Sequence, residues 1–101
     1  MGKLNKITLL AVANQSLSYD APDNGARYQL RFYELAGGQM AADVDIDDVP
    51  ILRGQRIVAE CPIIPYKASA KNANFVILTN GDDEPDWREF GTEQNLFYGA
   101  V

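Results

Sequence analysis

The chain has 101 residues, of which 47% are hydrophobic and 23% charged, and its formal net charge is −5. This length and balance predict a single folded domain over residues 1–101 and are far from the composition of a disordered segment. The chain has no histidine and only one cysteine, Cys61. This removes the commonest general base and excludes an internal disulfide or a multi-thiolate zinc site, so we expect no metal and no cofactor.

The negative charge is concentrated at the C-terminal end. Residues 82–101 contain six acidic side chains and one basic side chain, Arg88, whereas acids and bases balance over residues 1–81. Affinity for a phosphate backbone comes largely from cations that displace condensed counterions, and this chain has no basic stripe. We therefore expect no binding of nucleic acid.

The start of the chain resembles a signal peptide only weakly. A short apolar run at residues 7–14 follows two lysines, but it leads directly into an alternating strand. No run approaches the roughly 18 apolar residues that a membrane-spanning helix requires. We expect neither secretion nor a membrane contact.

Hydrophobic alternation with a period of two predicts short strands along most of the chain. Strands are expected at residues 7–12 and 15–19, and the clearest pair at 27–32 and 40–47. Gly37-Gly38 is expected to close that pair into an antiparallel hairpin. The side chains predicted to face inward are Tyr28, Leu30, Phe32, Met40, Ala42, Val44 and Ile46. Those predicted to face outward are Arg27, Gln29, Arg31, Ala41, Asp43, Asp45 and Asp47.

The second half of the chain predicts further short strands at residues 55–61, 74–79 and 96–98. Residues 62–65 contain two prolines and are expected to be irregular or at a sheet edge. Residues 83–90 could hold one short turn of helix. The prediction is an all-β fold, a single small antiparallel β-barrel or sandwich of about six or seven short strands.

The alternating aspartates, together with Asp48, raise the question of a calcium site, because carboxylate oxygens are preferred calcium ligands. Same-face side chains on a strand are about 7 Å apart, too far for three of them to reach one ion at roughly 2.4 Å. The spacing also lacks the glycine and glutamate of an EF-hand loop. We therefore favour a solvated strand face, paired with Arg27 and Arg31 across the hairpin.

The acidic loop at residues 82–86 and the single cysteine could each have a chemical function or a purely structural role. The acidic loop Asp82, Asp83, Glu84 and Asp86 could bind a metal or supply an acid and a base, but a solvated turn is favoured because no histidine or nucleophile accompanies it. Cys61 precedes a proline in an apolar neighbourhood, so we expect it to be buried and inert.

Five large apolar side chains crowd into twelve residues near the C-terminus: Trp87, Phe90, Leu96, Phe97 and Tyr98. Clustered aromatic residues that stay outside a small core usually mark an interface. The same residues could instead close one end of the fold and complete its sheet. Both readings stay open from the sequence.

The order of these features over nearly the whole chain resembles a family of small proteins of phage tails, the baseplate plug proteins of contractile-tailed bacteriophages. The segments that carry the resemblance are Ile7-Thr8-Leu9, Asn14-Gln15-Ser16-Leu17, Tyr28-x-Leu30-x-Phe32, Gly38, Asp45-Ile46-Asp47-Asp48, Pro50-Ile51-Leu52-Arg53-Gly54, Phe75-Val76-Ile77-Leu78, Asp83-Glu84-Pro85-Asp86, Phe90-Gly91 and Leu96-Phe97-Tyr98.

The resemblance implies an all-β, non-enzymatic structural subunit of the virion, made in the host cytoplasm. It would pack in several copies against tail-tube and baseplate hub proteins and close the tail lumen before injection, since subunits of symmetric assemblies need complementary patches. The acidic residues Asp82, Asp83, Glu84 and Asp86 would then repel DNA that passes through the tube, a hypothesis drawn from the sign of their charge.

Two other functions remain open. One is an acidic inhibitor that mimics nucleic acid, of the anti-restriction or anti-CRISPR type, supported only by the charge of residues 82–101. The other is a metal-assisted enzyme that uses Asp82, Asp83 and Asp86. Metal titration would test the second, and binding to a basic nuclease would test the first.

Overall fold

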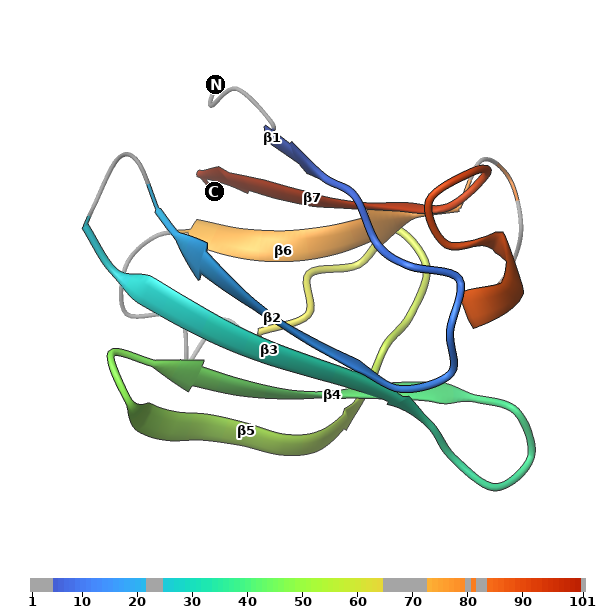
Figure 1. The fold of residues 1–101 in the computed structure, drawn as a ribbon, viewed down its shortest axis with the longest axis horizontal. Coiled ribbons are helices and arrows are strands. Elements are labelled where there is room, and N and C mark those ends of the chain that lie inside the picture. Colours follow the sequence, from blue (N-terminus) through green and yellow to red (C-terminus); the bar gives the residue numbers. More distant parts are fainter. Residues whose placement is uncertain (1–4, 22–24, 65–72, 80, 82–83, 101) are drawn as a thin grey trace.

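The computed structural model describes residues 5–21, 25–64, 73–79, 81 and 84–100. Within these residues the chain forms strands and one short 3₁₀ turn and contains no α-helix (Figure 1). The elements are β1 Asn5–Ile7, β2 Gln15–Asp20, β3 Arg27–Glu34, β4 Met40–Ile46, β5 Val49–Arg56, β6 Ala73–Leu78, η2 Trp87–Glu89 and β7 Asn95–Ala100. Nothing in this part of the chain is a helix long and apolar enough to cross a membrane.

The strands form two antiparallel sheets, one of three strands in the order β1-β7-β6 and one of four strands in the order β2-β3-β4-β5 (Figure 1). No ladder of the described residues joins the two sheets, so the fold is a sandwich and not a closed barrel. This confirms the all-β prediction and decides between its two forms. Each sheet buries one face against the other, which is the arrangement expected of alternating strands.

The central hairpin of β3 and β4 is confirmed. Its register runs without interruption from the pair Tyr28 and Ile46 to the pair Glu34 and Met40. Gly37 and Gly38 close it with φ angles of 94° and 88°, a conformation that glycine adopts without steric cost. All the side chains predicted to face inward on these two strands are buried.

Ala41 was predicted to face solvent, and this is wrong, because the residue is fully buried. In the register of the sheet it lies between Tyr33 on β3 and Arg56 on β5. A methyl group between two such long side chains is covered even on the outer face.

The chain turns earlier than predicted after β4. Asp47 and Asp48 have φ angles of 51° and 67°, so they form a tight turn and do not extend the strand. Two consecutive residues with positive φ are typical of the type I′ turns that join hairpin strands. The next strand therefore starts at Val49, and Pro50 is tolerated in it because β5 lies at the edge of the sheet.

The predicted strand at residues 55–61 is wrong beyond Arg56, where β5 ends. The chain then crosses to the other sheet and follows the outer edge of β6. The N–H groups of Glu60 and Ile63 donate to the carbonyl oxygens of Ile77 and Phe75 at 2.9 and 2.8 Å. Residues 62–64 are irregular, as predicted, and residue 65 lies outside the described residues.

Cys61 belongs to this crossing segment and is exposed, which corrects the prediction of a buried thiol. The apolar residues that surround it in the sequence take the buried positions instead. Ile57, Ile63 and Ile64 are each at most 2% exposed.

The remaining elements agree with the sequence in kind and differ in length. The N-terminal strand was predicted at residues 7–12, but β1 is confined to Asn5–Ile7 and a loop follows, in which Leu10 is 65% exposed. β2, β6 and β7 contain or nearly match their predicted ranges, and η2 is the short helical turn predicted within residues 83–90.

Four aromatic rings from both sheets form the centre of the sandwich: Tyr19, Tyr28, Phe75 and Tyr98. In five pairs of these rings the centroids lie between 4.9 and 5.9 Å apart, all in tilted or edge-to-face arrangements. Such geometry stabilises aromatic pairs beyond the burial of their area. The cluster fixes the two sheets against each other and so fixes the outer faces that are available for contacts.

Candidate interaction surfaces

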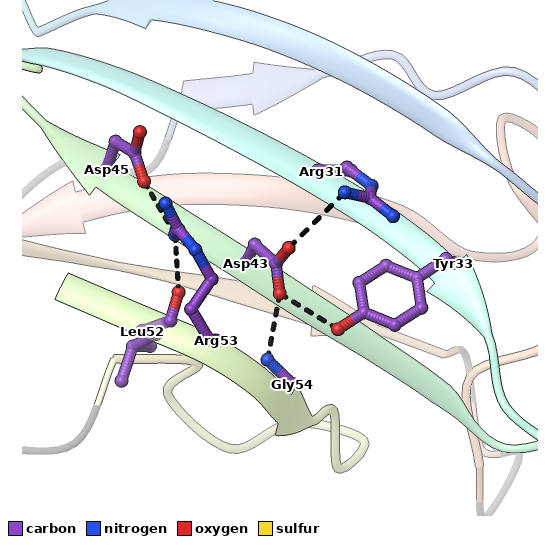
Figure 2. A network of polar contacts seen from close by, with 7 residues as sticks. All are labelled: Arg31, Tyr33, Asp43, Asp45, Leu52, Arg53 and Gly54. Atoms are coloured by element: carbon purple, nitrogen blue, oxygen red, sulfur yellow. Dashed lines mark hydrogen bonds and ion pairs between the residues drawn. The ribbon is translucent and has the colours of Figure 1, made fainter. Parts of the chain in front are cut away.

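The outer face of the four-stranded sheet carries a polar network centred on Asp43 of β4 (Figure 2). The Tyr33 hydroxyl and the backbone N–H of Gly54 both donate to Oδ1 of Asp43, each at 2.8 Å. Nη1 of Arg31 lies 3.6 Å from Oδ2 of the same carboxylate. Neighbours from β3 and β5 thus hold one carboxylate whose side chain is only 16% exposed.

This environment shifts the pKa of both partners in the Tyr33–Asp43 hydrogen bond. Partial burial alone would raise the pKa of Asp43, but the hydrogen bonds from Gly54 and Tyr33 and the charges of Arg31 and Arg53 outweigh it and lower that pKa. The hydrogen bond to Asp43, followed by burial, raises the pKa of Tyr33 above its ordinary value. At neutral pH the network therefore contains an ionised aspartate and a neutral tyrosine.

We expect Asp43→Asn to lower the free energy of unfolding by about 1 kcal/mol at pH 7, because charge-assisted hydrogen bonds become neutral ones. A carboxyl whose pKa is lower in the folded state stabilises the fold above its unfolded pKa, near the ordinary value of 3.8, and loses that effect as the pH falls toward its folded pKa. Urea unfolding at pH 7 and at pH 3 measures both points. The difference between the variant and the natural protein should shrink at pH 3, and a difference that stays constant would contradict the assignment.

The other charges of this face are also paired. Nη1 of Arg53 lies 2.7 Å from Oδ1 of Asp45 and donates to the carbonyl oxygen of Leu52 at 2.8 Å (Figure 2). The predicted pairing of Arg31 across the hairpin is confirmed by its contact with Asp43. The side chain of Arg27, in contrast, pairs with Asp20 of β2 at 3.2 Å.

Arg27 does not pair across the hairpin as predicted. Asp47, the acidic residue nearest to it there, binds the backbone of Arg27 and not its guanidinium. Asp47 lies in the turn after β4, where its Oδ1 accepts from the Arg27 N–H at 2.9 Å. This hydrogen bond ties the turn to the start of β3. The Arg27 guanidinium pairs instead with β2, on the other side of β3, where Asp20 stands directly opposite Arg27 in the register.

A hollow of about 400 Å³ lies on this outer face, between the small side chains of β2 and the longer ones of β4 and β5. Its lining residues are Ser16, Leu17, Ser18, Gln29, Leu30, Arg31, Asp43, Asp45 and Arg53. The hollow is shallow and polar, which suits contact with another protein better than enclosure of a small molecule.

The aspartates of this face do not converge on one point. Asp43 is directed to Tyr33 and Gly54, and Asp45 to Arg53. Among the residues that the structure describes, no group of three or more acidic or cysteine side chains is placed to share a metal ion. The carboxylates act here as acceptors for neighbouring donors.

The five apolar residues of the predicted C-terminal interface divide between the core and the surface. Phe90, Leu96 and Tyr98 are at most 2% exposed and pack inside the sandwich. Trp87 and Phe97 are only partly buried. Of the five predicted interface residues, only Trp87 and Phe97 therefore remain candidates for contact with a neighbouring subunit.

Trp87 lies in η2, whose backbone is capped by Asp86. Oδ1 of Asp86 accepts from the backbone N–H and from Nη1 of Arg88 at 3.0 and 3.1 Å. The Arg88 guanidinium lies 4.6 Å from the centre of the Trp87 ring. Nε1 of Trp87 is shielded from solvent and has no hydrogen-bond partner among the described residues. The Trp87 indole is thus held in place, while its N–H group makes no hydrogen bond with the described residues.

Phe97 lies on the outer face of the three-stranded sheet, opposite Lys6 and Val76 on the neighbouring strands. A shallow hollow of about 510 Å³ lies beside it, lined by Glu60, Leu78, Thr92, Glu93, Asn95 and Phe97. This hollow combines two apolar side chains with two carboxylates at its rim.

The predicted acidic surface is described only in part, because Asp82 and Asp83 lie outside the described residues. Glu84 pairs with Nη2 of Arg56, and the two side chains are 58% and 48% exposed. Asp86 pairs with Arg88. Both described acids of the loop therefore have an arginine partner, which reduces their contribution to a negative field.

In a comparison with protein families, residues 4–101 match the family described as Cyanophage baseplate Pam3 plug gp18. The chain belongs to this family. The match confirms the resemblance to baseplate plug proteins that the sequence predicted. Membership of this family gives the chain a structural role in the phage baseplate. A search of curated proteins finds no match.

Family membership also bears on the other functions considered. A baseplate component belongs to the virion tail and contacts other baseplate components. The inhibitor hypothesis rested on the acidic residues 82–101, and the structure pairs Glu84 and Asp86 with arginines. Of the three aspartates in the enzyme hypothesis, only Asp86 is described, and it caps η2.

Three residues that position the surfaces of this plug-family chain were not singled out from the sequence as supports. Gly54 donates its N–H to Asp43 with a φ of 70°. Gln94 is fully buried and binds the 84–86 loop, since its Oε1 accepts from Asp86 N–H at 2.7 Å and its Nε2 donates to the Glu84 carbonyl at 3.2 Å. Gly91 passes against the backbone of Leu9. No local signal marked Gln94, because its neighbours Glu93 and Asn95 are polar as well.

Proposed function

We propose that this chain is a plug subunit that closes the tip of the tail tube before injection. It acts through contacts with tail-tube and baseplate hub proteins, in several copies within the assembled virion, after synthesis in the host cytoplasm. The observation that carries the proposal is the family match over residues 4–101. The role of a closure element is expected from the word plug in the family description.

The geometry supports a role in contacts. The fold is a small sandwich with an aromatic centre, and its outer faces offer two shallow hollows lined mainly by polar side chains. Shallow, mixed surfaces of this kind are typical of protein–protein interfaces. The partly exposed Trp87 and Phe97 are the side chains that we expect neighbouring subunits to cover, because aromatic residues dominate the binding energy of interfaces.

Trp87 is the stronger of these two candidates. An indole offers a large apolar area and one N–H donor, which makes tryptophan effective where one side is apolar and the other polar. Nε1 of Trp87 is shielded within the chain, so the part of the indole that a neighbouring subunit would cover is the accessible apolar part of the ring. The acidic residues Asp82, Asp83, Glu84 and Asp86 remain a proposed surface toward the DNA path.

The role of closure is tested in a phage that carries this gene. Phage in which the gene is disrupted are expected to form tails that leak DNA or are not completed, and a plasmid copy of the gene should restore them. Electron microscopy and protection of the packaged DNA from nuclease measure the two outcomes. Disrupted phage that retain their DNA and infect normally would contradict the proposal.

We expect Trp87→Ala to reduce incorporation of the chain into tails. Loss of an aromatic anchor costs about 2 kcal/mol at an interface, which is about thirtyfold in affinity. Mass spectrometry of purified particles, with the disrupted phage complemented by each variant, measures the incorporated amount.

Val58→Ala is the matched control for Trp87→Ala, because Val58 is 49% exposed and lies outside both hollows. Trp87→Phe keeps most of the apolar packing and separates a folding defect from a contact defect, and thermal unfolding of each purified variant gives its stability. Normal incorporation of a folded Trp87→Ala chain would remove Trp87 from the interface.

A further inference from the structure

The two sheets have four outer edges, and three of them are guarded against pairing with another strand. β1 has only three residues, and Lys6 points outward from it. The edge of β6 is covered by the crossing segment, through the hydrogen bonds of Glu60 and Ile63. Short strands, charged lysines and covering segments are the means by which native proteins protect sheet edges.

β5 is guarded in a different way. Pro50 lacks an N–H, Gly54 has a φ of 70°, and the register against β4 shifts twice. The Arg53 side chain also returns to the carbonyl of Leu52. Proline and bulges bend an edge strand away from the flat geometry that pairing requires.

Among the residues that the structure describes, nothing of this kind guards the edge of β2. It pairs with β3 over six consecutive residues, from Gln15 to Asp20, without a register shift. It contains no proline, glycine, lysine or arginine, and its only charge is at its last residue. The Gln15 side chain binds the backbone of Leu10, so the open stretch is Ser16 to Asp20. A flat, regular edge with unpaired backbone groups is a template for strand addition.

We propose that β2 pairs antiparallel with β2 of a second copy of this chain, about a two-fold axis at Ser18. The two four-stranded sheets would then form one continuous sheet of eight strands. The register follows from facing pairs: Ser18 opposes Ser18 of the second copy, and Ser16 opposes its Asp20. On the inner face, Leu17 opposes Tyr19 of the second copy.

This register is self-complementary in polarity. Leu17 and Tyr19 are the partly buried residues of β2, so apolar side chains meet on the inner face and small polar ones on the outer face. A slip of one residue would place inner against outer side chains. A two-fold axis at Asp20 would bring two carboxylates together, which destabilises a strand pair.

The charges on the outer face favour a second copy as the partner. Within each chain, Ser16 stands opposite Arg31 of β3 in the strand register. In the proposed register Asp20 of the second copy lies beyond Ser16, about 10 Å along the sheet from Arg31. Each chain thus brings a carboxylate toward an arginine that is 62% exposed, twice by symmetry, and no like charges face each other on adjacent strands.

This inference deepens the proposed function, because it names the surface through which copies of the plug would associate, but its test is independent of the phage. A chain that dimerises through β2 and is dispensable in tails would refute only the proposed function. A monomeric chain that is required for tail closure would refute only the proposed pairing.

The test is residue-specific crosslinking of the full chain. In a Cys61→Ser background, which removes the exposed native thiol, Ser18→Cys places two cysteines opposite each other at a Cα separation of about 5 Å, within the range of a disulfide. Gln29→Cys is the matched control, since Gln29 stands opposite Ser18 on β3, one strand farther from the axis. Its two copies would be about 14 Å apart, too far for a bond.

The expected result is that Ser18→Cys forms a crosslinked dimer under mild oxidation at least about tenfold faster than Gln29→Cys. Sedimentation equilibrium gives a second readout, in which Ser18→Lys should raise the dimer dissociation constant about tenfold, because two lysines would face each other, while Gln29→Lys should change it little. Equal crosslinking of the two cysteine variants, or a natural chain that stays monomeric at millimolar concentration, would overturn the proposal.

Discussion

Replacing Phe75 by alanine is expected to lower the free energy of unfolding by about 3–5 kcal/mol, the largest effect of any substitution considered. The Phe75 ring is fully buried and contacts three other rings, at centroid distances of 5.1 Å to Tyr28, 5.1 Å to Tyr98 and 5.9 Å to Tyr19. Its removal leaves a cavity between the sheets. For a chain of this size the midpoint of thermal unfolding should fall by well over about 10 °C.

Val76→Ala is the control for this prediction. Val76 follows Phe75 on β6 but faces the outer side of the sheet and is only partly buried. Its truncation should cost about 1 kcal/mol or less. Calorimetry of the two variants measures the difference, and equal losses would mean that the aromatic cluster is not the centre of the fold.

Gly91→Ala is expected to lower the free energy of unfolding by about 3 kcal/mol. Gly91 has a φ of 85°, where a residue with a Cβ atom pays about 1–2 kcal/mol. A Cβ at this position would lie 2.5 Å from the carbonyl oxygen of Leu9, a backbone atom that cannot turn aside. Relief of that overlap adds about 1–3 kcal/mol and displaces the loop after β1 from the η2 region.

Gly37→Ala separates the two causes. Gly37 has a similar φ of 94°, but nothing lies within 4 Å of a Cβ built there. This variant should lose only the conformational part, about 1–2 kcal/mol, and chemical unfolding of both proteins gives the comparison. Similar losses for the two variants would show that the approach of Gly91 to Leu9 relaxes without cost.

The sequence was most informative where alternation and turn residues agreed. The hairpin of β3 and β4 was predicted in its position, its closing glycines and its inward-facing residues, because each residue of an alternating strand must choose between two faces. The exceptions were Ala41, which is buried, and Asp47, which lies in the turn. The sequence was least informative around Asp47, where an acidic residue fits a solvent-exposed strand position and a left-handed turn equally well. The position of β5, the shortening of β1 and the exposure of Cys61 followed from contacts that no local pattern carries.

The candidate surfaces show the same division. The sequence indicated Trp87 and Phe97 together with Phe90, Leu96 and Tyr98, and their burial separated them only in the structure. The network around Asp43 depends on Gly54, eleven residues away, which meets it because β4 and β5 pair with shifted register.

By itself the sequence determined the all-β class, the pairing of Arg31 across the central hairpin, the likeness to baseplate plug proteins and the absence of a histidine or of a second cysteine. These properties depend on residue types and on a local period of two. Only the tertiary structure decided that the sheets form a sandwich, that three sheet edges are guarded while no described segment covers β2, and which aromatic residues stay at the surface. The reason is physical: burial and edge protection are set by segments distant in the chain, such as the crossing segment against β6, and a local pattern does not specify which of them meet.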